Sequence, residues 1–144
     1  MSKLPLEGVR VLDMTLVWAG PYATMFLGDW GAEIVRVESI HHFQLTTRGP
    51  MARPPEDVVR QGGMQNPFPN RDPGKRPWNR QPTFNSHARH KLSMTVDLRQ
   101  PKGKEIFYQL IEKSDIFIEN NVPETIEKLG ITYHHGSASE MDFL

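Results

Sequence analysis

The sequence predicts an α/β protein with a Rossmann-like, mostly parallel sheet built from βα units. Short segments rich in branched apolar residues occur at residues 9–15, 33–39, 92–98 and 116–119, as expected of strands. Stretches that open with proline and have helical character follow the first, third and fourth of these segments. The length of 144 residues suits one domain, or part of one, and excludes two complete domains.

The first three elements form a βαβ unit. The first segment shows little alternation of apolar and polar residues, which is typical of a strand covered on both faces. Gly20 and Pro21 precede a helix expected over residues 22–30, and Gly31 ends it. In the second strand Arg36 and Glu38 are expected to face polar surroundings. Such units cross over in the right-handed sense.

The same pattern recurs in the second half of the chain. Pro101 begins a helix in which Ile106 and Leu110 are spaced to lie on one face. After the fourth strand, Pro123 begins a short helix that Gly130 can end. This second βα unit has a similar spacing, and it favours a single sheet over two separate folds.

Residues 39–91 form a long loop or insertion between the two units. They show no sustained periodicity, and eight prolines occur between residues 50 and 82, where each proline interrupts a ladder or a helix. Phe68, Trp78 and Phe84 are candidate anchors. We therefore expect an irregular segment that wraps in an ordered way around the domain or a partner.

Residues 133–144 form an atypical tail with no helical or strand period. Such a tail would make a poor domain terminus, and a sheet that ends at the fourth strand is expected to be incomplete. An incomplete sheet leaves an edge and apolar faces uncovered, which predicts aggregation or dependence on a partner.

Charge and composition exclude several classes of protein. Seventeen basic residues balance seventeen acidic ones, so we expect neither nucleic acid nor a membrane surface as a partner. The absence of cysteine excludes disulfides and thiol chemistry. The sequence has no signal peptide and no apolar run of about 18 residues, and a cytoplasmic protein is expected.

Two loops follow strands at positions where α/β sheets bind ligands. Residues 17–21 precede a helix, and a phosphate or diphosphate would suit them, although the G-x-G-x-x-G dinucleotide fingerprint is missing. The alternative is a turn that packs Trp18 into the core. Asn120 and Asn121 offer carboxamides that can read adenine or pantetheine amides; equally, they fit a turn or a helix cap before Pro123.

The remaining polar residues carry weaker signals. Asp97 and Arg99 fit a solvated ion pair, and Lys91 and Lys128 fit surface lysines. The histidines lack a nearby carboxylate at metal-ligand spacing, so no metal site is expected. No G-x-S-x-G motif marks a nucleophilic serine.

Several motifs, taken in order, resemble the class III CoA-transferases, the CaiB/BaiF family that includes the formyl-CoA transferases. The resemblance begins with PLEGVRVLD at residues 5–13, AGPYAT at 19–24 and GAEIVRVE at 31–38. It continues with HKLSMTVDL at 90–98, PKGK at 101–104, and the run from 115 to 130.

The resemblance implies an enzyme that moves CoA between an acyl-CoA and a carboxylic acid. In that family an aspartate forms a mixed anhydride and then a thioester, and two chains interlock as a homodimer. The resemblance also implies coenzyme A as ligand. On the matching positions its contacts are expected at Trp18, Ala19, Ser39, Val96, Asp97, Leu98, Arg99, Asn120, Asn121, Val122 and Lys128, with Arg99 and Lys128 charged toward the phosphates.

Four positions depart from the family pattern. Trp18 replaces a residue that is often polar, Leu92 replaces Arg, Asn121 replaces Phe, and Lys128 replaces Arg. A lysine offers a point charge in place of a planar fork. We expect altered CoA affinity or orientation.

The resemblance places the nucleophilic aspartate beyond the matched stretch, and Asp142 lacks its motif. No catalytic residue is therefore assigned. The resemblance implies that residues 1–144 are the N-terminal part of a Rossmann-like CoA-binding domain, and the chain is interpreted as a truncated or partial CoA-transferase. The alternatives are a non-catalytic CoA-binding or assembly module, and a segment of an α-methylacyl-CoA racemase-like enzyme.

Overall fold

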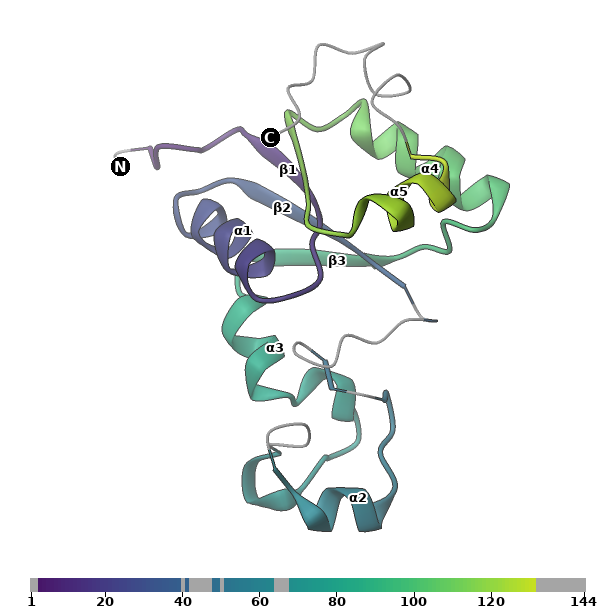
Figure 1. Ribbon diagram of the computed structural model, residues 1–144. Helices are drawn as coiled ribbons and strands as arrows, with labels where there is room; N and C mark the ends of the chain where they lie inside the picture. The colour runs from purple at the N-terminus through teal and green to yellow at the C-terminus, as the bar shows by residue number, and fades with distance from the viewer. Residues whose placement is uncertain (1–2, 40, 42–47, 50, 64–67, 132–144) are drawn as a thin grey trace.

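A four-stranded, entirely parallel sheet forms the centre of the protein (Figure 1). The computed structural model describes residues 3–39, 41, 48–49, 51–63 and 68–131. The strands are β1 (Arg10–Met14), β2 (Glu33–Glu38), β3 (Lys91–Thr95) and β4 (Ile116–Glu119), in the spatial order β3-β2-β1-β4. The predicted α/β fold is confirmed, since this order is that of a Rossmann-like half-sheet with a switch point between β1 and β4.

Helices cover both faces of the sheet. Helix α1 (Ala19–Asp29) lies on one face, while α4 (Pro101–Ile111) and α5 (Pro123–Leu129) lie on the other (Figure 1). Alternate residues of β1 separate two cores: Leu12 packs with Phe107 of α4, and Val11 packs with Ile34 on the α1 side. This double coverage explains why the sequence of β1 shows little alternation of apolar and polar residues.

Helix α1 lies unusually close to the sheet. It begins at Ala19, three residues earlier than predicted, and it ends before Gly31, whose φ is 103°. A Cβ atom on Gly20 would overlap the side chain of Thr15 just after β1. Glycine is therefore required at position 20 by the contact between helix and sheet.

The second unit follows its prediction, with one shorter strand. Helices α4 and α5 begin at Pro101 and Pro123, and Gly130 ends α5 with a left-handed φ of 67°. Strand β3 stops at Thr95, while residues 96–98 leave the sheet as an extended loop. These three residues become part of the pocket described below.

The insertion contains more regular structure than the sequence suggested. It holds helix α2 (Glu56–Gln61), the 3-10 turns η1 (Pro69–Arg71) and η2 (Pro77–Asn79), and helix α3 (Pro82–His87). The expectation of an irregular loop was wrong here because prolines stand at the first positions of three of these elements, where a missing N–H costs nothing.

The predicted aromatic anchors of the insertion are confirmed. Phe68 is buried, the guanidinium of Arg53 lies 5.5 Å from the Trp78 ring, and that of Arg48 lies 3.7 Å from the Phe84 ring. Such cation–π contacts give the insertion its order with few apolar residues.

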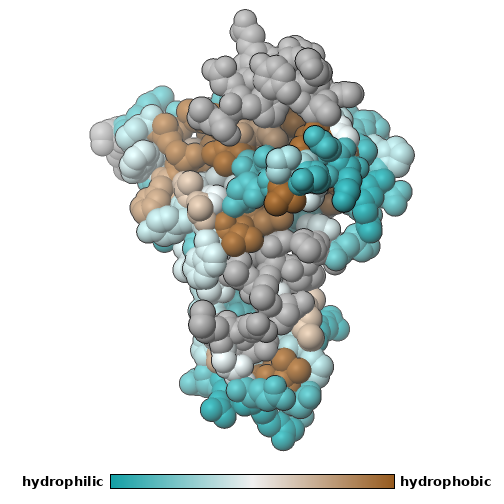
Figure 2. Space-filling model, viewed as in Figure 1, coloured by the Kyte–Doolittle hydropathy of each residue, from teal (hydrophilic) through white to brown (hydrophobic). Residues whose placement is uncertain are grey.

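Large apolar side chains remain at the surface. Trp18, Tyr22, Phe26 and Trp30 recur at every fourth position of α1 and its ends, and each is at least 39% exposed. Figure 2 shows apolar side chains on the face of the sheet-containing part that is in view, and mainly hydrophilic ones at the lower end. Within the described part of the chain, no helix is both long and apolar enough to cross a membrane.

We expect Gly20→Ala to destabilise the protein, although alanine ordinarily stabilises a helix by about 1 kcal/mol relative to glycine. The added methyl group would meet the Thr15 side chain, and overpacking of this kind costs roughly 1–3 kcal/mol. Urea unfolding measures the effect. A free energy of unfolding higher than that of the wild type would show that α1 lies farther from β1 than described.

Candidate functional site

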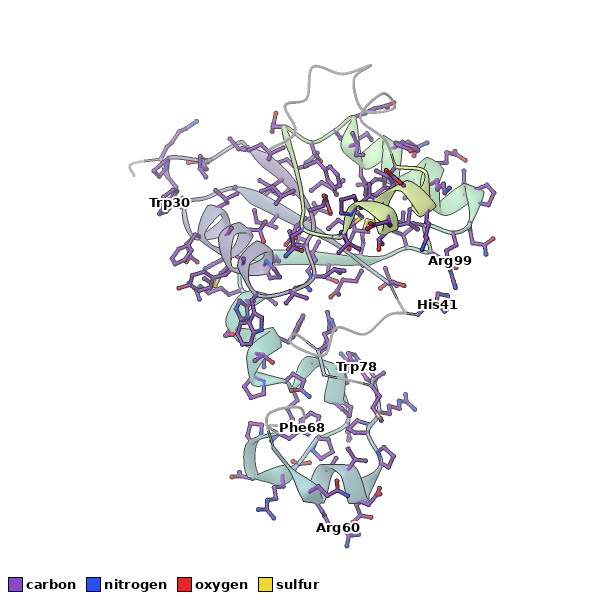
Figure 3. The ribbon with its side chains drawn as sticks, in the orientation of Figure 1. Trp30, His41, Arg60, Phe68, Trp78 and Arg99 are labelled. Carbon is purple, nitrogen blue, oxygen red and sulfur yellow. The ribbon has the colours of Figure 1, made fainter. Side chains whose placement is uncertain are left out.

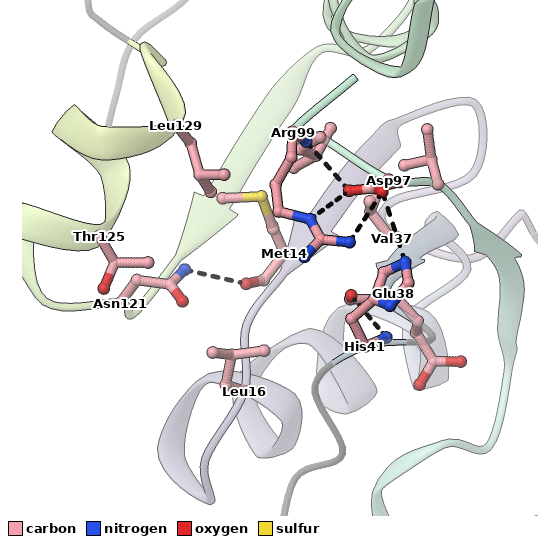
Figure 4. Close-up of a pocket in the computed structure, with 13 residues that line it drawn as sticks. Met14, Leu16, Val37, Glu38, His41, Asp97, Arg99, Asn121, Thr125 and Leu129 are labelled. Atoms are coloured by element: carbon pink, nitrogen blue, oxygen red, sulfur yellow. Dashed lines mark hydrogen bonds and ion pairs between the residues drawn. The ribbon is translucent and has the colours of Figure 1, made fainter.

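A pocket of about 440 Å³ opens at the carboxyl ends of the strands (Figure 4). Parallel α/β sheets bind ligands at this edge, beside the switch point in strand order. All four strands contribute, directly or through residues within two positions of their ends. The lining residues are Met14, Leu16, Val37, Glu38, Ser39, His41, Val96, Asp97, Leu98, Arg99, Asn121, Thr125 and Leu129.

The pocket has an apolar wall and a polar rim. Met14 and Leu16 come from the end of β1, Val37 from β2, Val96 and Leu98 from the loop after β3, and Leu129 from α5. The hydrophobic core continues directly into this wall, because Met14, Val37, Val96 and Leu98 also belong to the cluster around Phe107. The wall is therefore apolar and continuous with the packed core, as in many small-molecule sites.

Asp97 and Arg99 form the charged part of the rim. The Arg99 Nε donates to Asp97 Oδ1 at 2.9 Å, and Nη2 donates to Oδ2 at 3.0 Å, so the predicted ion pair is confirmed. These hydrogen bonds hold the pKa of the Asp97 carboxyl well below its ordinary value. His41 Nε2 lies 3.4 Å from the same carboxylate (Figure 4).

Arg99 is the more accessible partner of this pair. Its side chain is 59% exposed, against 22% for Asp97. Figure 3 places Arg99 beside His41. The carboxylate therefore orients the guanidinium and leaves its outer edge available to an anion.

Glu38, at the end of β2, joins the insertion to the sheet. Its carboxylate accepts hydrogen bonds from Arg48 Nε (2.7 Å), Arg48 Nη2 (2.5 Å) and Ser93 Oγ (2.5 Å). Arg48 also donates to the Trp78 carbonyl. Burial raises the pKa of Glu38, but the hydrogen bonds from Arg48 and Ser93 and the charge of Arg36 outweigh it and leave the pKa below its ordinary value.

Arg36 is more deeply buried than its predicted polar surroundings suggested. It is only 2% exposed, and its Nε lies 3.3 Å from Glu38 Oε1. The Nε and Nη1 atoms have no hydrogen-bond partner among the described residues. The carboxylate of Glu38 is thus the principal compensation for this buried cation.

The two asparagines after β4 hold the neighbouring loop in place. Asn120 accepts a hydrogen bond from Leu16 N at 2.8 Å and donates one to the Val17 carbonyl at 2.9 Å. Asn121 Nδ2 donates to the Met14 carbonyl at 3.3 Å. The alternative of a side-chain helix cap was wrong, because Val122 is the N-cap of α5 and no side chain caps it.

Asp13 and Lys91 form a buried ion pair beneath α1. Their side chains are 0% and 1% exposed, and Lys91 Nζ lies 2.9 Å from Asp13 Oδ2. The interpretation of Lys91 as a surface lysine was therefore wrong. Strand β3 pairs with β2 in a register that places Lys91 on the α1 face of the sheet, where the Asp13 carboxylate lies. Burial lowers the pKa of Lys91, and Asp13 opposes that shift.

Trp18 lies at the surface of the turn before α1. The alternative that it packs into the core was wrong, since the residue is 48% exposed and its backbone has φ 36° and ψ −80°. This backbone geometry turns the side chain outward. Its ring meets His87 edge-on with centroids 5.3 Å apart.

The structure brings together six of the eleven residues expected to contact CoA. Ser39, Val96, Asp97, Leu98, Arg99 and Asn121 line the pocket. The other five do not line it: Ala19 and Trp18 lie in the first turn of α1 and just before it, while Asn120, Val122 and Lys128 lie around the start and end of α5. Lys128 is exposed, as its sequence context suggested.

Sequence reasoning missed the apolar wall and the buried ion pair. A charged residue in the middle of an apolar strand, as Asp13 is, was the available signal for a buried polar network. Nothing local marks Lys91 as its partner, because the two residues are 78 positions apart. Among the described residues, no three His, Cys, Asp or Glu side chains are grouped to hold a metal ion.

Comparison with known sequences points in one direction. The sequence model of CoA-transferase family III matches residues 6–140. The chain is 38% identical over 133 residues to a succinyl-CoA:glutarate CoA-transferase from Mus musculus, with 92% of this chain and 25% of the relative covered. It is 33% identical over 128 residues to a formyl-CoA:oxalate CoA-transferase from Bradyrhizobium sp., with 89% and 25% covered.

Solved structures agree with the sequence comparison. A CaiB/BaiF family protein from Brucella suis superposes with a TM-score of 0.70 at 28% identity, covering 95% of this chain and 31% of that one. A hypothetical protein from Mycobacterium tuberculosis superposes with a TM-score of 0.61 at 29% identity, covering 95% and 31%. The chain spans about a quarter of the length of the curated relatives it matches.

The Glu38→Gln variant should unfold more readily at neutral pH, by roughly 1–3 kcal/mol, because an amide compensates Arg36 and Arg48 poorly. The folded-state pKa of Glu38 is lowered from 4.5, so its stabilising contribution is complete above about pH 4.5 and is lost as the pH falls through the lowered pKa.

Urea unfolding of both proteins between pH 3 and 7 measures this dependence, with Glu105→Gln as the control at an exposed ion pair. The difference in free energy of unfolding between the wild type and Glu38→Gln should decrease toward low pH. A difference that stays constant with pH would contradict the assigned role of the carboxylate.

Proposed function

The chain belongs to CoA-transferase family III, and from that membership we propose that it forms the coenzyme A side of an active site that transfers CoA between an acyl-CoA and a carboxylic acid. The intact enzyme would use an aspartate to carry the acyl group, first as an anhydride and then as a thioester. This chain would contribute recognition of the nucleotide.

The pocket is the observation that carries the proposal. Residues from the ends of β1 and β2, from the loop after β3 and from the start of α5 meet in it, although they lie far apart in the sequence. Six of them occupy positions at which the family resemblance places CoA contacts. An apolar wall beside an accessible guanidinium suits a ligand with a flat base and phosphates.

Each polar group has a separate task in this proposal. Arg99 would meet a phosphate with the guanidinium edge that Asp97 leaves open, and Lys128 would add a second positive charge at the end of α5. The side chain of Ser39 and the amide of Asn121 would offer hydrogen bonds at the rim. The apolar wall would exclude water from one face of the base.

The acyl-carrying carboxylate is proposed to come from outside the described residues. Asp13 is wholly buried and bonded to Lys91, so it cannot reach a thioester. Asp97 is held by two hydrogen bonds from Arg99, and its lowered pKa makes it a weak nucleophile. Glu38 is likewise occupied by Arg48 and Ser93.

Titration calorimetry with CoA tests the proposed recognition. Arg99→Gln should weaken CoA binding roughly tenfold, the loss of about one charge-assisted hydrogen bond. Arg60→Gln is the matched control, because Arg60 is also exposed and ion-paired but lies at the far end of the insertion (Figure 3). Correctly folded wild-type protein that gives no heat with CoA would overturn the proposal.

A carboxylate exchange assay tests whether this chain by itself can transfer CoA. With a radiolabelled dicarboxylic acid and its CoA thioester, the 144-residue chain alone should show no exchange above the protein-free rate, because the carboxylates of Asp13, Glu38 and Asp97 are already engaged. Measurable turnover by the purified chain would refute the proposal that the acyl-carrying carboxylate lies elsewhere. Binding of CoA without turnover is also what a non-catalytic CoA-binding module would give, and recovery of exchange with an added catalytic polypeptide separates the two.

A further inference from the structure

The loop between β1 and α1 is held at three separate points. At its start, Asp13 Oδ1 accepts hydrogen bonds from the backbone N–H and the hydroxyl of Thr15, at 2.9 and 2.5 Å. In its middle, Asn120 bonds the backbone of residues 16 and 17. Just beyond its end, in the first turn of α1, Lys91 Nζ donates to the Pro21 carbonyl at 2.8 Å.

Lys91 and Asp13 connect the two ends of this loop. The Lys91 ammonium has three hydrogen-bond partners: the Asp13 carboxylate, the Pro21 carbonyl and the Thr24 hydroxyl, the last at 2.6 Å. Thr24 also donates to Asp13 Oδ2 at 2.7 Å. One buried cation thus joins the central strand, the edge strand and the first turns of α1.

The held loop has an unfavourable conformation that needs support. Trp18, in its centre, has a φ of 36°, in a region where a bulky side chain costs about 1–3 kcal/mol. Leu16, two residues earlier, lines the pocket. The shape of this loop therefore depends on its anchors, and the shape of the pocket wall depends on the loop.

A buried ion pair contributes little net stability to a fold. Desolvation of the two charges offsets much of their attraction, and apolar residues of equal volume are often as stabilising. Burial lowers the pKa of Lys91 and the charge of Arg36 adds to this shift, while the charges of Asp13 and Glu38 oppose it. Net stability therefore does not account for this buried cluster, whereas a role in positioning the loop does.

We propose that Lys91, acting with Asp13, is a positioning residue that sets the affinity for CoA by fixing the β1–α1 loop, without lining the pocket itself. The inference rests on the proposed function, because CoA is the ligand whose binding the loop would control. Its structural part, the control of the loop by Lys91, can be measured without any ligand.

Variants of Lys91 and Asp13 distinguish a role in positioning the β1–α1 loop from a role in stabilising the fold. Lys91→Met alone leaves the Asp13 carboxylate buried without its partner, so it should destabilise the fold. The pair Asp13→Asn with Lys91→Met removes both charges and should recover most of the stability. It still lacks the donor to Pro21, so CoA should bind roughly tenfold more weakly, equivalent to about 1.4 kcal/mol. Lys102→Met, at an exposed lysine of α4, is the control and should bind CoA normally.

Fluorescence of Trp18 gives a readout independent of CoA. In a Trp30→Phe, Trp78→Phe background, Trp18 is the remaining tryptophan, and it contacts the His87 ring. Acrylamide should quench this fluorescence more strongly when Asp13→Asn and Lys91→Met are added than in the background protein. The reason is that the released loop moves Trp18 away from the His87 ring.

The outcomes are distinct. A double variant that folds, binds CoA as the wild type does and shows unchanged quenching would overturn the positioning role and leave a structural one. Unchanged quenching with weakened binding would also overturn the stated mechanism. If the wild type does not bind CoA at all, the proposed function fails, whereas increased quenching in the double variant would still support control of the loop by Lys91.

Discussion

The carboxylate of Asp13 is the constraint on which much of the structure depends. It stands on the central strand of the sheet with no access to solvent, and a charge there requires compensation by hydrogen bonds and an opposite charge. The compensation comes from Thr15, Thr24 and Lys91. Satisfying one carboxylate therefore fixes the loop after β1, the position of α1 and the beginning of β3.

A second carboxylate does the same for the insertion. Glu38 stands at the end of β2, where Arg48 and Ser93 converge on it, and Arg48 extends to the backbone of the insertion and the ring of Phe84. Charge-assisted hydrogen bonds to Glu38 thus attach the insertion to the sheet, and the cation–π contact of Arg48 with Phe84 lies within the insertion itself. Such attachments are directional, so they specify one arrangement where a small apolar surface would permit several.

The charged side chains that line the pocket are already paired, and this pairing shapes how the pocket can act. Because Asp97 already pairs with Arg99 and Glu38 with Arg48, a ligand would meet an apolar wall and an oriented cation in place of free carboxylates. In the proposed function this arrangement suits recognition of the nucleotide and leaves acyl transfer to another part of the active site.

Local chemistry was enough to predict the two βα units, their glycine and proline boundaries, and the family resemblance, because propensities and short motifs act over a few neighbouring residues. It also predicted six residues of the pocket through that resemblance, but not their apolar companions. Tertiary structure alone decided the strand order, the burial of Lys91 and the bonds of Asn120. The partner of Lys91 is 78 residues away and that of Asn120 is 104 residues away, and the strand order depends on pairings between segments that are not neighbours in the sequence. A lysine reads as a surface residue in its own sequence context, and only the distant carboxylate of Asp13 makes its burial favourable.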